Sequence, residues 1–89
     1  MITLFERATV PDFETWHEVF KNFRPTLKAK GVIASSVYRA TDDPNDVTVV
    51  HEFATLDEAK AFIDSQELHD ARSRAKVPGT PTIWFTTKV

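Results

Sequence analysis

Between residues 13 and 27, bulky apolar side chains recur at spacings of three and four residues: Phe13, Trp16, Phe20, Phe23 and Leu27. This period is typical of an amphipathic α-helix, in which charged side chains occupy most of the remaining positions. Four of the five are aromatic, and the chain of 89 residues holds seven Phe, two Trp and one Tyr in all. Since so much aromatic surface is stable only when it is buried, we expect a folded core.

Residues with known capping behaviour mark both ends of this helix. Asp12 can cap its first turn, while Lys28 lies beside its carbonyl end and Gly31 can take the left-handed conformation that ends many helices. Pro25 lies inside the helix and has no backbone N–H to donate. We therefore predict a kink or a break near residues 23–24.

Four other segments are rich in strand-forming residues: Ile2–Ala8, Val32–Ala40, Val47–Ala54 and Thr82–Val89. Between the second and the third, residues 41–46 read Thr-Asp-Asp-Pro-Asn-Asp, a composition that favours turns. The second and third strands are therefore predicted to form a hairpin.

A second helical region is predicted between the third and fourth strands. Thr55 and Glu58 have the spacing of a capping box, in which the two side chains satisfy each other's backbone amides at a helix start. Ser65 is a candidate for opening a second helical piece, and the region ends before Val77-Pro78.

The expected order is β, α, β, β, α, β in a single domain spanning residues 1–89. Right-handed crossovers and hairpin pairing favour the ferredoxin-like α+β fold, a four-stranded antiparallel sheet with two helices on one face. Apolar residues alternate to both sides of the predicted strands, as Val49-Val50 and Ile83-Trp84 show. A lone chain would expose apolar sheet surface to water, so we expect a homodimer.

The charge balance excludes some classes of partner. Eleven basic and thirteen acidic residues give a formal net charge of −2 without a basic run, which argues against nucleic-acid binding. No apolar run is long enough to cross a membrane, and the first residues lack the pattern of a secretory signal. The chain has no cysteine, as suits a reducing compartment, so we expect a cytoplasmic protein.

Known cofactor and metal motifs are also missing. The only two glycines, Gly31 and Gly79, cannot build a phosphate-binding loop or a dinucleotide fingerprint. His17, His51 and His69 fall on different predicted elements without ligand spacing. We therefore expect no cofactor and no metal ion.

Several runs along nearly the whole chain match a known family: residues 10–16, Phe20, Gly31, 42–49, 52–53, 58–59, Phe62, 65–68 and 79–81. On these residues the chain resembles the dimeric α+β barrel superfamily. Within it, the chain is most similar to the antibiotic biosynthesis monooxygenase group and the relatives loosely called cyclases. The resemblance implies that two βαββαβ subunits pack sheet to sheet, each with a ligand pocket between its sheet and its helices.

The resemblance also implies an activity, which is cofactor-independent oxygenation or cyclisation of a small aromatic or polyketide-like molecule. Haem-degrading relatives have a Trp and a His where this chain has Ala54 and about Phe62, which disfavours haem as the ligand. The alternative function is a non-catalytic ligand-binding or interaction module that dimerises through its sheet.

His51 and Glu52 are the candidate catalytic residues. His51 continues the face that carries Val49 and Phe53, and an imidazole in such surroundings can serve as a general base. The alternative role for His51 is a hydrogen-bonded residue in the dimer interface. Glu52 points the opposite way along the strand, and the family geometry would place it nearer the pocket; alternatively it pairs with backbone or with an arginine such as Arg7.

Three aromatic residues are candidate ligand contacts. Tyr38 can orient a phenolic or carbonyl group through its hydroxyl, and Trp16 and Trp84 can stack against a flat ligand. Trp16 falls on the apolar stripe of the first helix, so packing is its expected role. Tyr38 and Trp84 are equally suited to the pocket, the interface or the surface.

Overall fold

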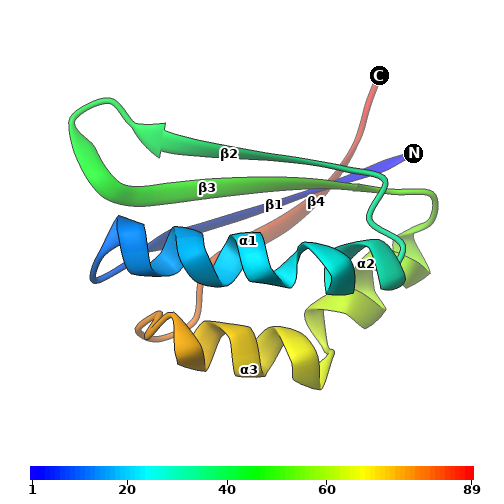
Figure 1. Ribbon diagram of the computed structural model, residues 1–89. Helices are drawn as coiled ribbons and strands as arrows, with labels where there is room; N and C mark the ends of the chain where they lie inside the picture. The colour runs from blue at the N-terminus through cyan, green and yellow to red at the C-terminus, as the bar shows by residue number, and fades with distance from the viewer.

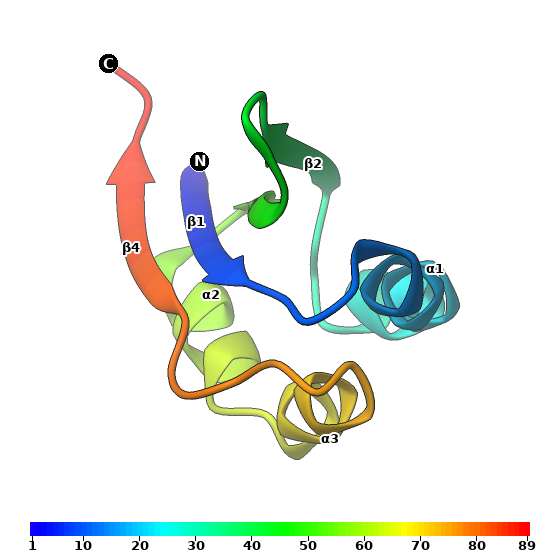
Figure 2. The same ribbon diagram turned by 90° about the vertical axis from the view of Figure 1, so that its left-hand side faces the viewer.

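A four-stranded antiparallel sheet carries three helices on one side, as the computed structural model of residues 1–89 shows (Figures 1 and 2). The strands are β1 (Ile2–Thr9), β2 (Ala34–Ala40), β3 (Asp43–Phe53) and β4 (Thr82–Thr87), and they lie in the order β2-β3-β1-β4. The helices are α1 (Phe13–Ala29), α2 (Leu56–Ile63) and α3 (Gln66–Arg74). The predicted ferredoxin-like α+β fold is confirmed, with its second helical region divided into α2 and α3.

Helix α1 continues through Pro25, so of the predicted kink or break the break is wrong. The first turn is capped as predicted, because the Asp12 carboxylate accepts the backbone N–H of Thr15 at 3.0 Å. Phe23 and Leu27, one on each side of Pro25, are both buried in the core. The packing of these two side chains offsets the single backbone hydrogen bond that proline cannot make.

The hairpin between β2 and β3 is tighter than predicted. Strand β3 begins at Asp43 rather than at residue 47, which leaves only residues 41–42 between the strands. The pairing shifts between Arg39 and Ala40, and this irregularity takes up the extra residues on one strand. Pro44 is tolerated because it lies at the end of the strand, where a missing backbone donor disturbs the ladder least.

The end of α1 and the start of α2 meet at Gly31. This glycine has a φ of +94°, a left-handed conformation that L side chains rarely adopt. A Cβ placed on it would lie 2.5 Å from Oε2 of Glu58. Glu58 belongs to the predicted capping box, in which its backbone N–H donates to Oγ1 of Thr55 at 3.2 Å. Ser65 caps α3 in a similar way, as predicted, by accepting the N–H of Leu68 at 3.3 Å.

The two faces of the sheet have different surroundings. On the covered face, alternate strand residues point toward the helices and form the core with them, including Leu4, Val47, Val49 and Phe53. On the other face, which we call the open face, no helix lies over the strands (Figure 2). The fold thus has a layer enclosed between sheet and helices and a sheet surface that no other element covers.

Candidate functional site

A cavity of about 60 Å³ lies between the covered face of the sheet and the helices. Its walls are mostly hydrophobic and come from all three helices, from β1 and β3, and from the connection between α3 and β4. Only three residues in the lining carry a titratable side chain: Glu6, His51 and Arg72. A cavity of this volume holds a few water molecules at most, and its polar groups are therefore where any chemistry would occur.

His51 reaches the cavity because of the two-residue period of β3. Val49 and Phe53 share its face of the strand, and all three are buried. The imidazole is only 2% exposed, and its ring lies 5.4 Å from that of Phe62 in an edge-on arrangement. Its Nδ1 atom lies 2.7 Å from Oγ of Ser35 on β2, the residue directly opposite in the ladder. Strand register therefore fixes both the position of the ring and its orientation.

Burial lowers the pKa of His51 from 6.5 to about 4, because the charged imidazolium would lose its hydration in this apolar setting. The ring is therefore neutral at pH 7. When Nδ1–H donates to Ser35, Nε2 carries a lone pair and can accept a proton; when Ser35 donates to Nδ1, Nε2–H can donate to a ligand oxygen. No protein group bonds Nε2, so this is the nitrogen left for a ligand.

An ion pair that the sequence analysis missed lies on another side of the cavity. Nε of Arg72, on α3, donates to Oε1 of Glu6, on β1, at 3.1 Å, and Nη2 of the same arginine bonds the same oxygen. Both side chains are mostly buried, with 18% of Arg72 and 13% of Glu6 exposed. Arg72 holds further N–H donors, so the pair can bind an oxygen atom of a ligand as well as join helix to sheet.

A sequence signal for this pair was present. Glu6 stands between Leu4 and Ala8 in a strand whose alternate residues face the core, so its charge interrupts an apolar row. Arg72 follows Ala71, which is buried in α3, and thus borders the apolar side of that helix. A charged residue in a core-facing row is buried only when it is paired. An acidic residue in one such row and a basic residue in another therefore indicate an ion pair between them.

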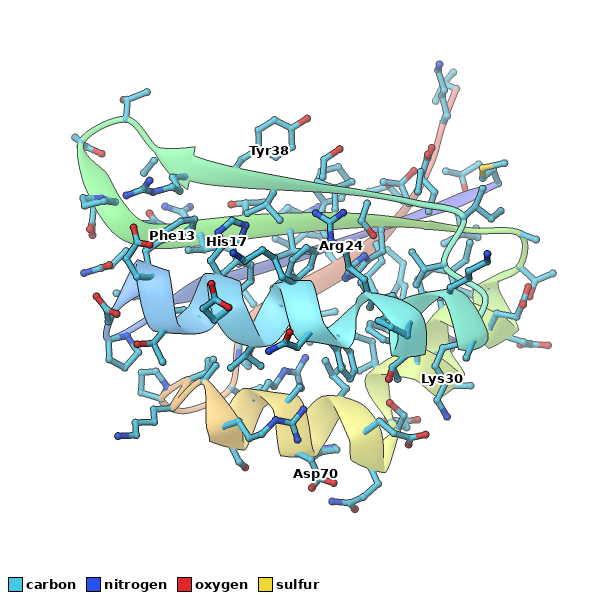
Figure 3. The ribbon with its side chains drawn as sticks, in the orientation of Figure 1. Phe13, His17, Arg24, Lys30, Tyr38 and Asp70 are labelled. Carbon is cyan, nitrogen blue, oxygen red and sulfur yellow. The ribbon has the colours of Figure 1, made fainter.

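The five residues predicted from the sequence fall into two groups. His51 and Trp16 line the cavity, and Trp16 also packs as expected, stacked on Phe20 at 5.2 Å between ring centroids. Tyr38 and Trp84 lie on the open face, 59% and 41% exposed, and Tyr38 points away from the helices (Figure 3). Because they lie on the opposite face of the sheet, these two residues cannot contact a ligand in the cavity.

Two expectations about the orientation of β3 are wrong. Glu52 does not lie nearer the pocket, because it pairs with Thr3 in the register that faces the open side. His51 is not on the surface where a second sheet would pack, because it points toward the helices. Arg7 does not bond Glu52 either; it binds Asp46, with Nε 2.9 Å from one carboxylate oxygen. The family resemblance implied that Glu52 points toward the helices. Successive strand residues point to opposite faces, so an assignment that is wrong by one residue exchanges the two faces.

The rest of the chain holds no group of three or more His, Asp or Glu side chains gathered as metal ligands would be. None of the helices combines the length and the apolar character that crossing a membrane requires.

The fold and the cavity together define a small α+β protein with a mostly apolar cavity between sheet and helices. The chain belongs to the antibiotic biosynthesis monooxygenase family, whose pattern matches residues 5–74. No curated protein matches the sequence.

Solved structures share this fold at low sequence identity. A Bordetella bronchiseptica protein assigned to the antibiotic biosynthesis monooxygenases is 19% identical and superposes with a TM-score of 0.84, covering 99% of this chain and 96% of that one. SnoaB, a cofactor-independent oxygenase from Streptomyces nogalater, is 14% identical, with a TM-score of 0.82 and coverage of 99% and 92%. The likeness confirms the fold.

Proposed function

We propose that this protein is a cofactor-independent oxygenase or cyclase that removes a proton from a small aromatic or polyketide-like molecule held in the cavity. One observation carries the proposal: a neutral, buried histidine lines a mostly apolar cavity, and one of its ring nitrogens is bonded by no protein group. The family supports an oxygenase-like role, and SnoaB is an example with the same fold.

The chemistry needs little from the protein beyond proton transfer. When a phenol or an activated methylene loses a proton to Nε2 of His51, the resulting phenolate or enolate is electron-rich. In oxygenation, that anion supplies electrons to dioxygen and a C–O bond forms at the former methylene carbon. The peroxide takes back the proton held by His51, and the resulting hydroperoxide loses water to leave a carbonyl. In cyclisation, the same anion attacks a carbonyl of its own chain. Both routes begin with one general-base step.

The low pKa of His51 suits this step when the ligand becomes an anion. In the empty cavity the imidazolium has no negative partner, so its charged form is disfavoured. A phenolate beside the ring supplies that partner at the moment the proton moves. The surrounding hydrophobic walls exclude water, which strengthens the attraction between the two new charges.

An aromatic ligand of three fused rings, such as an anthrone, is larger than the cavity, so the walls must move to admit it. The connection from α3 to β4 supplies Ala75, Val77 and Pro81 to the lining and has no regular structure. It includes Lys76, whose φ of +58° lies in the left-handed region and costs about 1 kcal/mol for a residue with a side chain. We expect this connection to move when a ligand enters, because no regular hydrogen-bond pattern holds it.

The test is oxygen uptake with 1,8-dihydroxyanthrone, a planar phenol with an activated methylene. His51→Gln should lower the rate about a hundredfold, as expected when a general base is lost. His69→Gln, on the exposed side of α3, is the matched control and should leave the rate unchanged. Full activity in His51→Gln would remove His51 from the mechanism.

The same experiment separates the alternative function, a non-catalytic binding module. In that case the anthrone would raise the melting temperature of the protein in a saturable way without any oxygen uptake.

We further propose that a second copy of the chain covers the open face. Phe5 and Trp84 stack there with 5.2 Å between ring centroids and an interplanar angle of 5°, and Trp84 remains 41% exposed. Exposed, pre-ordered aromatic pairs of this kind are typical of interface centres.

A further inference from the structure

A second hollow, open to solvent, lies between α1 and the edge strand β2. Its volume is about 440 Å³, within the range of small-molecule sites. We call it the α1–β2 groove, and it is lined by ten residues of α1, β2 and the connection between them: His17, Phe20, Arg24, Leu27, Lys28, Val32, Ile33, Ala34, Ser35 and Val37. Phe20 and Leu27 line both spaces and thus form the wall between groove and cavity.

The polar part of the groove is cationic. His17, Arg24 and Lys28 are spaced by seven and four residues, which places them in one row along α1. Figure 3 shows His17 and Arg24 extending from α1 toward the strands. No Asp or Glu lines the groove, and neither Arg24 nor Lys28 takes part in a salt bridge. Two permanent charges therefore face the same hollow without a counter-charge from the protein.

Several other cations of the chain are held in salt bridges. Lys21 binds Glu18, Lys30 binds Glu67, and Arg72 binds Glu6. Arg24 and Lys28, on the groove wall, have no such partner. Arg24 lies with its guanidinium 5.9 Å from the centroid of the Phe20 ring, which orients it along the groove.

The opposite wall of the groove is apolar. Val32 and Val37 are partly buried there, and Ile33 is 57% exposed at the mouth. A ligand that fits must therefore carry a negative group for the cationic row and an apolar body for the strand side. The Ser35 hydroxyl, which bonds Nδ1 of His51, is the one additional polar group on the strand side.

We propose that the α1–β2 groove binds small molecules in which a carboxylate, sulfonate or phosphate is attached to a flat or branched apolar body. This site is separate from the cavity in which the proposed function places proton transfer, and it does not depend on that function. The cationic wall accounts for the negative group of the ligand, and the apolar wall accounts for its apolar body. Both walls are needed to identify the ligand class.

The probe is 8-anilinonaphthalene-1-sulfonate, with N-phenyl-1-naphthylamine as its uncharged counterpart. In fluorescence titrations, the double variant Arg24→Gln with Lys28→Gln should bind the sulfonate about tenfold more weakly, because two partly exposed charge contacts are lost. Its affinity for the uncharged amine should change less than twofold. Raising the salt concentration should weaken sulfonate binding in the native protein and much less in the double variant.

The matched control removes the same charge elsewhere. Lys60→Gln with Arg74→Gln changes two exposed cations on α2 and α3 and should bind both probes as the native protein does. A further variant, Ile33→Asp, adds a negative charge at the exposed groove mouth without touching the cavity and should abolish sulfonate binding. Equal sulfonate affinity in the groove and control variants, or equal affinity of the native protein for both probes, would overturn the proposal.

Failure of this site and failure of the proposed function are separate results. Groove binding is read from affinity, whereas the role of His51 is read from oxygen uptake. A protein that binds the sulfonate in the groove but consumes no oxygen would keep the groove and lose the enzyme.

Discussion

Each face of the sheet carries one salt bridge between an arginine and an acidic residue, and the two salt bridges differ in their exposure to solvent. On the covered face, Glu6 and Arg72 pair almost out of contact with solvent and join β1 to α3. On the open face, Arg7 and Asp46 pair across β1 and β3, with 58% of the arginine side chain exposed. The guanidinium of Arg7 lowers the pKa of Asp46 in solvent, where such pairs stabilise little.

The aromatic residues differ between the faces in the same way. Phe53 on the covered face is fully buried and lies 5.6 Å from the Phe62 ring, whereas the Phe5–Trp84 stack on the open face leaves Trp84 in contact with water. The covered face thus supplies the buried core, whereas the open face leaves aromatic surface exposed to solvent. The same strands therefore stabilise the fold on one side and, in the homodimer proposed above, would form the interface on the other.

The largest expected effect contrasts one aromatic residue from each face. Phe53→Ala should lower the free energy of unfolding by about 4 kcal/mol, because it leaves a cavity in a packed core. Phe5→Ala should cost about 1 kcal/mol, the value of an aromatic pair that is only partly buried. Urea unfolding of both variants at one fixed protein concentration measures the difference, and Phe53→Leu serves if the alanine variant does not fold. Equal losses would mean that the faces do not differ.

A second prediction concerns association. Trp84→Glu places a charge at the centre of the proposed interface and should weaken the dimer about a hundredfold, while the protomer fold is retained. Sedimentation velocity over a range of concentrations measures this, with Lys60→Glu on the exposed side of α2 as control. If the native chain sediments as a 10.1 kDa monomer at every concentration, the open face is not a homodimer interface.

The third prediction uses pH to examine the covered face. The folded protein holds His51 with a pKa of about 4, below the 6.5 of an exposed imidazole. Between these values the unfolded chain binds more protons, so stability is present above pH 6.5 and is lost as the pH falls toward 4. From pH 7 to pH 5 the loss should be about 2 kcal/mol.

Urea unfolding at both pH values measures this loss. His51→Gln removes the titration and should show a clearly smaller change between pH 7 and pH 5. An identical change in the variant would mean that His51 is not the group that titrates.

Much of the fold could be predicted because its signals are local. The period of α1, its Asp12 cap, the Ser65 cap and the bond from the Glu58 amide to Thr55 each depend on residues within one or two helical turns, and each is confirmed. The return bond of the capping box differs, because the Glu58 carboxylate accepts from the Thr55 hydroxyl and not from the Thr55 amide. The hairpin was misjudged because Pro44 and its neighbours favour a turn by composition, whereas pairing with β2 extends the strand through them.

The candidate site was harder to predict, since it depends on which side of the sheet the helices cover. The alternation of His51 and Glu52 was evident from the sequence, but no local signal indicates which of the two points toward the helices. The Glu6–Arg72 pair joins residues 66 positions apart, so only the tertiary structure shows that they meet. The cationic row of α1 was not predicted from the sequence, because its groove forms only where β2 lies beside the helix.

Because Gly31 and Glu58 lie close together, we expect local unfolding at the end of α1 to be coupled to local unfolding at the start of α2. The C-terminus of α1 and the N-terminus of α2 are far apart in the sequence, yet Gly31 leaves room for the Glu58 carboxylate, which in turn lies within 3.2 Å of the Thr55 hydroxyl. Fraying of either helix end removes a neighbour of the other. The amide protons of both ends should therefore exchange with solvent together, as one cooperative unit at this corner of the molecule.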